Sequence, residues 1–179
     1  MKRFLFLTMF VFIALMAVVS VYQKEEKPLP QKLEQAMRLT RMNEYHDDDY
    51  GYVVRYPSFF EQTSDSLMDR GCCRFSFWQH SILIEQSVFV EQNTEGLSID
   101  EAMKSYASDL HATKQRKGDD YFILSGVLFN DTSHIPGRNY YMKFVQHRKL
   151  WFVQSLVYPK ECEGAMNRVK KEIDGWEIW

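Results

Sequence analysis

The first residues of the chain form an apolar run that differs from everything after it. Lys2 and Arg3 precede residues 4–19, which carry no charged side chain, and the run closes at Tyr22 before the charged residues 24–27. A helix without charge has no side to turn toward water, so a place in a soluble core is disfavoured. A basic start before an apolar core is typical of an export signal, and the run from 4 to 22 approaches the roughly 20 residues that span a bilayer.

Two fates of this segment stay open. Ser20 and Val18 supply small residues for cleavage, although the preferred pattern is A-x-A-like. If the segment is not cleaved, its basic end would stay in the cytoplasm and anchor the chain in the membrane. We therefore expect residues 1–22 to be a signal peptide or a membrane anchor. In both cases the remainder is exported, either membrane-anchored with its domain outside the cytoplasm or secreted into a space such as the periplasm of a cell envelope.

The next stretch, residues 23–45, is polar and begins in an extended form. Pro28 and Pro30 fix their φ angles and remove backbone donors. Residues 31–44 then predict a short helix with a thin apolar stripe that includes Leu33 and Met37. Such a helix either spaces the domain from the membrane or docks weakly on it, and we favour the spacer.

Six segments rich in β-branched and aromatic residues follow, and two helices interrupt them. The predicted strands are residues 50–57, 73–80, 82–90, 120–129, 139–147 and 150–158. The short breaks after 80 and 147 predict antiparallel hairpins. Ser98 and Glu101 have the spacing of a capping box and begin a helix that runs to about residue 110. A second helix is expected over 161–173, with Gly175 as its C-cap.

Two of these strands are apolar on both faces, at 121–124 and 150–153. Such strands need cover on both sides. We therefore expect an α+β domain over residues 46–179, an antiparallel six-stranded sheet with helices packed on it in an α/β/α-type sandwich. The composition is 45% hydrophobic and 26% charged, which excludes wholesale disorder. The formal net charge of −2 lacks the basic excess of a nucleic-acid binder, so we expect no nucleic-acid partner.

The segment over residues 50–60, Tyr-Gly-Tyr-Val-Val-Arg-Tyr-Pro-Ser-Phe-Phe, resembles the opening of PsbP-like domains. In that family a Gly-aromatic strand runs into Tyr-Pro and an aromatic residue, for which Phe59 or Phe60 would stand here. The order of strands and helices over 49–179 is similar to the same fold, which the nuclear-transport regulator Mog shares. The resemblance implies a non-enzymatic accessory domain that docks to a larger assembly or to a GTPase. It carries over no catalytic residue.

The cysteines are the residues from which chemistry could arise. Cys72 and Cys73 are adjacent and Cys162 is distant, which suits neither a zinc site nor a C-x-x-C redox motif. Outside the cytoplasm, a disulfide from Cys162 to one of the pair would close a loop of about 90 residues and add roughly 4–5 kcal/mol of stability. Free, buried cysteines are the alternative. Cys162 also begins a predicted helix, where a thiol pKa can fall.

The remaining polar and aromatic features predict exposed surfaces. We expect no catalytic residue, no cofactor-binding residue and no metal ligand among them. Residues 46–49, His-Asp-Asp-Asp, indicate a solvated acidic linker, since consecutive aspartates point in different directions. A basic tip after the first helix and two aromatic residues past the last one are expected as the partner surface. These partner-surface residues are Lys114, Arg116, Lys117, Trp176 and Trp179. Residues 130–138 form a polar connection whose first three match a glycosylation sequon.

These observations favour a non-enzymatic accessory or binding domain, exported or membrane-tethered, that docks to an envelope assembly. Its partners would be the membrane, through the N-terminal segment, and a protein. One alternative is a thiol-dependent enzyme or redox protein that uses Cys162 or the pair Cys72 and Cys73. Another is a carrier of a small apolar ligand, which would need an apolar cavity between sheet and helix.

Overall fold

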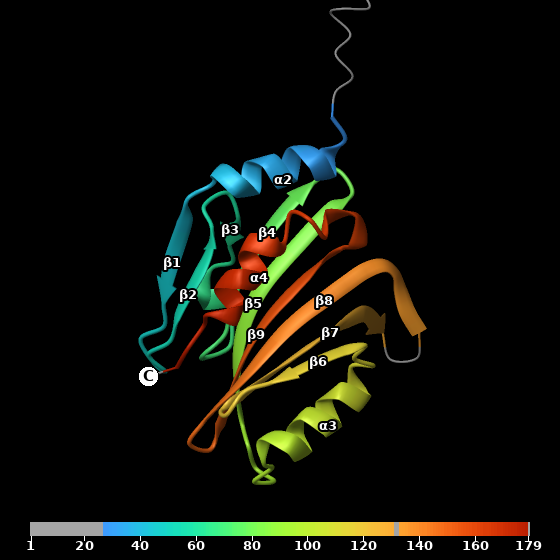
Figure 1. Ribbon diagram of the computed structural model, residues 1–179. Coiled ribbons are helices and arrows are strands. Elements are labelled where there is room, and N and C mark those ends of the chain that lie inside the picture. The colour runs from blue at the N-terminus through green and yellow to red at the C-terminus, as the bar shows by residue number, and fades with distance from the viewer. Residues whose placement is uncertain (1–26, 131–132, 179) are drawn as a thin grey trace, which may run out of the picture.

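A computed structural model describes residues 27–130 and 133–178 of the chain (Figure 1). Its elements are α2 (Leu29–Leu39), β1 (Met42–His46), β2 (Val53–Pro57), β3 (Glu61–Gln62), η1 (Asp65–Leu67), β4 (Cys73–Gln79), β5 (Ile82–Gln92), α3 (Ile99–Asp109), β6 (Lys114–Lys117), β7 (Tyr121–Asn130), β8 (Ser133–His147), β9 (Leu150–Pro159), η2 (Lys160–Cys162) and α4 (Asn167–Asp174). Among the residues described, no helix has the length and apolar character needed to cross a bilayer. The apolar run over 1–22 and Trp179 lie outside the described residues.

The main sheet is antiparallel and contains seven strands in the order β3-β4-β5-β9-β8-β7-β6. The α+β class and the hairpins β4–β5 and β8–β9 are confirmed. The count of six strands is corrected, because the basic tip is the edge strand β6 and a two-residue β3 pairs with the other edge, β4. The polar connection over 130–138 is also shorter than expected, since β7 runs to Asn130 and β8 begins at Ser133.

The first expected strand lies outside this sheet. Strand β2 pairs with β1 in a separate hairpin. Because β1 occupies residues that were expected to be helical, the helix expected over 31–44 ends at Leu39 and the chain continues as a strand. The turn depends on Asp47, which is buried and was expected in a solvated linker. Its Oδ1 accepts the backbone N–H groups of Asp49 at 3.1 Å and Tyr50 at 2.7 Å. Gly51 has a φ of 72°, which favours glycine, and completes the turn.

Helix α2 docks on the domain instead of acting as a spacer. Leu33 and Met37 are 3% and 1% exposed and belong to the same buried cluster as β4, β5 and α4. Arg168 of α4 is a charged residue that the pattern of the second predicted helix would place on its outer side. Its Nη1 instead donates to the carbonyls of Met37 at 3.0 Å and Thr40 at 2.6 Å, where α2 ends. The thin apolar stripe therefore suffices because a second helix holds the end of α2.

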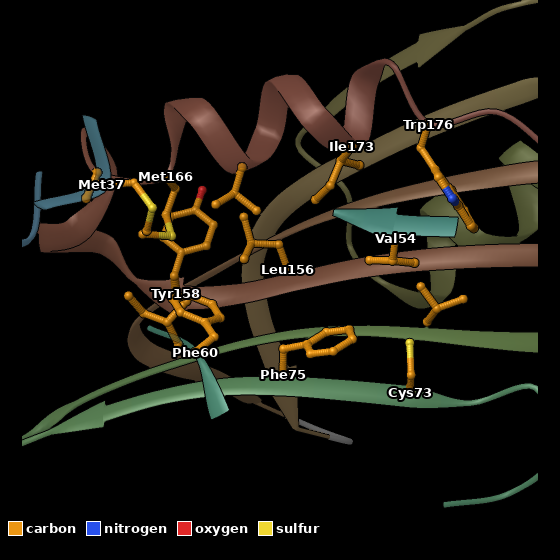
Figure 2. Packing of buried hydrophobic residues seen from close by; sticks show 14 of the residues in the cluster. Met37, Val54, Phe60, Cys73, Phe75, Leu156, Tyr158, Met166, Ile173 and Trp176 are labelled. Atoms are coloured by element: carbon orange, nitrogen blue, oxygen red, sulfur yellow. The ribbon is translucent and has the colours of Figure 1, made fainter. Parts of the chain in front are cut away.

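Both faces of the sheet are covered, as its two-sided apolar strands require. On one face, α3 buries Ala102 and Ala107 against Phe122, Phe144 and Trp151. On the other face, α2, the β1–β2 hairpin and α4 enclose a larger cluster. Figure 2 shows this layer, with Met37, Val54, Ile173 and Trp176 pointing toward Phe75 and Leu156 of the sheet.

The boundaries of the helices follow their capping residues. Ser98 accepts the backbone N–H of Glu101, and the Glu101 carboxylate accepts that of Ser98, which confirms the capping box. The last helix is shorter than expected, because a 3₁₀ turn occupies Lys160–Cys162 and α4 starts only at Asn167. Gly175 is the C-cap, as predicted, but its φ of −83° does not require glycine.

A buried lysine holds the end of α4 to the sheet. Lys143 of β8 is 2% exposed, and its Nζ donates to the backbone carbonyls of Asp174 at 2.8 Å and Trp176 at 2.6 Å. The ammonium also lies 4.4 Å from the ring centroid of Tyr121. Burial lowers the pKa of Lys143, so the charge costs free energy, which these contacts offset in part.

Replacing Lys143 with methionine keeps the length of the side chain but leaves both carbonyls without their donor. We expect K143M to lower the free energy of unfolding by about 1–3 kcal/mol, less than two lost bonds would imply, because the buried charge disappears as well. Denaturant unfolding measures the change. K104M is the matched control, since Lys104 is exposed on α3, and it should change stability by less than about 0.5 kcal/mol. Equal stability of K143M and the native chain would contradict the anchoring role.

Candidate functional site

One part of the sheet is left open beside α4. Strand register puts Lys114, Ser125, Tyr141 and Leu156 side by side on the face that α4 covers. Leu156 is fully buried in the cluster that α4 covers, whereas Lys114 on β6 is exposed. The cover therefore ends between β9 and the edge of the sheet.

A cavity of about 520 Å³ occupies this gap. We call it the β6–α4 groove, and its defining residues are Lys114, Tyr141, Tyr158, Lys160, Glu163 and Lys170. They come from β6, β8, β9, η2, the segment that leads into α4 and α4 itself, and most of them are distant in sequence. The sequence reasoning found only Lys114 among them. No local pattern marks the two tyrosines, because residues in strands that face a groove look the same as residues that face a core.

Fixed polar contacts order the floor of the groove. Tyr158 Oη donates to Glu163 Oε2 at 2.7 Å, and Lys170 Nζ makes an ion pair with Glu163 Oε1. The same ammonium lies 4.7 Å from the ring centroid of Tyr158 and 5.5 Å from that of Tyr141. The side chain of Lys170 is 16% exposed, so it is held within the groove.

A second ion pair borders the first. Arg116 Nη2 lies 2.5 Å from Asp174 Oδ1, and Tyr141 Oη donates to the same carboxylate oxygen. Lys117, one residue on, pairs with Asp100 at 2.7 Å. Two of the three predicted basic residues are therefore tied to carboxylates.

The pKa directions keep three groups of the floor in one protonation state at pH 7. Burial raises the pKa of Tyr158, and the Glu163 carboxylate raises it further. Burial together with Asp174 does the same for Tyr141. Burial acts to raise the pKa of Glu163, but the bonds from Lys170 and Tyr158 outweigh it and the net pKa is lowered. Constant protonation suits recognition by fixed charges and donors better than proton transfer.

The remaining basic residues give the groove an excess of positive charge. Within the described part of the chain, no carboxylate pairs with Lys114 or Lys160, and both are exposed. With Lys170 and Arg116 the groove and its border hold four cations against the two carboxylates of Glu163 and Asp174.

The aromatic part of the expected partner surface is corrected. Trp176 is 6% exposed, and its Nε1 donates to the carbonyl of Val53 at 2.8 Å. It lies edge-on to Tyr52 with ring centroids 6.2 Å apart and belongs to the core (Figure 2). Its position past the last helix suggested exposure, but the chain turns back there onto the β1–β2 hairpin.

Of the two alternatives for the cysteines, the structure has the free one: Cys72, Cys73 and Cys162 form no disulfide. Cys73 on β4 is opposite Val88 on β5, and Val88 is opposite Gln154 on β9. Two strand spacings, together about 10 Å, therefore separate Cys73 from Gln154. Cys162 follows the end of β9, eight residues beyond Gln154. Their Cα atoms are thus well beyond the roughly 7 Å that a disulfide can bridge. The β9 strand runs in the same direction as β4, so Cys72 is farther still.

The three thiols are poor nucleophiles. Burial raises the pKa of Cys73 to about 12 and that of Cys162 to about 11, and it also raises the pKa of Cys72. The helix start that could have activated Cys162 is a 3₁₀ turn of three residues, and nearby Glu161 raises its pKa further. The geometry gives the thiol-dependent enzyme no support.

The described residues offer no cluster of three or more His, Cys, Asp or Glu side chains that could hold a metal ion. Asp49 instead makes a bidentate pair with Arg70, at 2.8 and 2.9 Å. The cavity expected for an apolar ligand has no counterpart among the cavities described. The largest of these, about 690 Å³, is lined mainly by polar residues of two loops, with Asn93, Glu95 and Arg148 among them.

These pKa directions predict slow alkylation of the folded chain. At pH 7.5, iodoacetamide should modify Cys73 and Cys162 at least ten times more slowly than in the same chain unfolded in guanidinium, with Cys72 the fastest of the three. Because a raised pKa keeps the thiol protonated, the native rate should still rise at pH 9 and show no plateau near 8.5. Peptide mass spectrometry measures each site. A thiol that reacts faster in the folded chain would contradict the assignment and revive thiol chemistry.

No family model matches the chain, and no curated protein matches it. Among solved structures, the chain is similar to the solution structure of cyanobacterial PsbP (CyanoP) from Synechocystis sp. PCC 6803, with a TM-score of 0.55. The likeness covers 79% of this chain and 94% of that chain, at 12% sequence identity. At this identity the likeness concerns the fold alone, and it confirms that the chain has the PsbP-like fold that residues 50–60 suggested.

Proposed function

We propose that the chain is a non-catalytic accessory domain, exported and tethered to the membrane by its N-terminal segment, that docks to a protein assembly outside the cytoplasm. The observation that carries the docking role is the β6–α4 groove, an open, basic and tyrosine-lined site on an otherwise covered sheet. The PsbP-like fold supports the same role by resemblance. The export segment supports the location.

The groove favours an acidic segment of a partner protein. Lys114 and Lys160 stand exposed at its rim, and half-buried Tyr141 offers a broad, rigid face of low conformational entropy. Tyr158 is buried beneath them and holds Glu163 in place. The carboxylates of Glu163 and Asp174 already neutralise Lys170 and Arg116. The two rim lysines are therefore the cations that can pair with carboxylates of a partner. Rim charges of this kind set association rate and specificity more than they set affinity.

Pairing of a partner strand with β6 is a weaker alternative for the same edge. All four residues of β6 are exposed, and three of them are basic. Lysines on an edge strand discourage strand addition, because an incoming strand must bring matching charge. We therefore place the partner in the groove rather than along the edge.

Charge reversal at the rim tests this proposal. The full chain, affinity-tagged and purified in mild detergent from its own host, should carry a protein partner in native mass spectrometry. K114E/K160E should reduce the bound partner at least tenfold, because four units of charge change at the rim and an acidic segment would be repelled. K104E/K149E is the control, since it makes the same change of charge at two exposed sites outside the groove and should retain the partner.

Two results would overturn the proposal. One is equal retention of the partner by both double variants, which would place docking elsewhere on the surface. The other is turnover of a substrate by the purified chain that a single groove substitution abolishes, which would make the groove an active site.

A further inference from the structure

The largest exposed aromatic side chain of the described residues lies at one end of the sheet. Trp78, at the tip of the β4–β5 hairpin, is 79% exposed, although tryptophan is usually well buried. Its indole Nε1 donates to the carbonyl of His80 at 3.1 Å, across a turn in which His80 has a φ of 54°. The ring is thus held in place with its donor satisfied, and its apolar faces stay free. Leu83, half-buried, is its cross-strand neighbour.

The same end of the domain receives the chain from the apolar N-terminal run. A cavity of about 440 Å³ is lined by Leu29 and Pro30 at the start of α2 together with His80 and Ile82 of the hairpin. Figure 1 likewise shows the start of α2 beside the end of the β4–β5 hairpin. Trp78 and the first residues of the domain therefore share one end of the molecule.

The distance between this end and the apolar run is short. Leu29 is seven positions along the chain from Tyr22, where the run closes, with six residues between them. Even fully extended, they span at most about 25 Å. A domain tethered in this way cannot place its α2 end far from the bilayer surface, whatever its orientation.

The chemistry of this end matches the headgroup region of a bilayer. Tryptophan is enriched at membrane interfaces, where its amphipathic ring is partly buried and partly wet. Lys27 is exposed at the same cavity, and a lysine in this place can contact anionic lipid headgroups. Lys114 of the groove and Trp78 lie on strands near opposite edges of the sheet.

We infer that the β4–β5 hairpin tip rests in the lipid headgroup region, with the Trp78 indole inserted, and so fixes the orientation of the domain on the membrane. This inference rests on the proposed membrane tether. The hairpin acts as a second contact beside the tether, and two contacts limit the rotation of the domain on the membrane.

Depth-dependent fluorescence quenching tests the insertion. The full chain and W78F are each reconstituted into two kinds of vesicle, both made of phosphatidylcholine and phosphatidylglycerol. One kind carries no bromine, and the other contains lipid brominated at the 6,7 position of the acyl chain. The difference in emission between the two proteins isolates Trp78. We expect the brominated lipid to remove at least half of that difference signal. Because Trp78 is exposed, W78F should keep the circular dichroism spectrum and unfolding midpoint of the native chain.

The matched control moves the tryptophan to the far end of the sheet. K149W in the W78F background places an exposed indole on the β8–β9 turn, next to the end of β5 that is opposite the hairpin tip. Strand β5 has 11 residues, a length of about 36 Å, so this indole should lie beyond the reach of the bromine atoms and keep its full emission.

The outcomes separate the inference from the tether. If alkaline carbonate releases the chain from the vesicles, the chain has no membrane tether, and the inference that rests on the tether is overturned as well. A chain retained after carbonate, with Trp78 emission unchanged by brominated lipid, would overturn the inference and leave the tether standing. Equal quenching at positions 78 and 149 would also overturn it, because the domain would then have no preferred orientation. Quenching at 78 alone supports the inference.

Discussion

Strand β9 is buried on both faces along nearly its whole length, and this constraint organises the rest of the molecule. Val153 packs under α3 on one side, while Phe152 and Leu156 pack under the second layer on the other. A strand of this kind cannot face water on either side, so helices must cover both faces. Two short helices are too few for that area, and the β1–β2 hairpin and α2 complete the second layer.

The completed layer has an edge, and the groove lies at that edge. Helix α4 has only eight residues, and Lys143 holds its end over the middle of the sheet by donating to two carbonyls past its last turn. The strands beyond it, β7 and β6, keep one face in reach of solvent. Tyr141 and the Arg116–Asp174 ion pair border this face, because such side chains can pack on the sheet and still contact water. The open site is thus a consequence of where the buried lysine places the helix.

The two surfaces we assign have different relations to the core. The groove is polar and preorganised by the Glu163 and Asp174 ion pairs, which hold Lys170 and Arg116 in place. The hairpin tip is an extension of β4 and β5 beyond the area that the layers cover, so most of the Trp78 side chain stays exposed. A tethered accessory domain can use both surfaces, one toward the membrane and one toward a partner.

Local patterns in the sequence determined the elements whose causes are local. The capping box of Ser98 and the two hairpins were predicted, because caps and turns act over a few residues. The β1–β2 hairpin was missed, since a short polar segment becomes a strand only when it finds a partner. The same limit applied to β6, whose four residues show no apolar alternation.

What the tertiary structure alone decided is which side chains meet and which are exposed. Trp176 and Trp78 cannot be distinguished by composition, yet the chain folds the first onto Tyr52 and leaves the second in solvent. The cysteines, which the sequence allowed to pair, are kept apart by strand order. The groove joins residues from Lys114 to Lys170 that have no common local pattern. Burial and proximity depend on how layers pack over long sequence separations, whereas the sequence directly determines only short-range geometry and the apolar faces that must be covered.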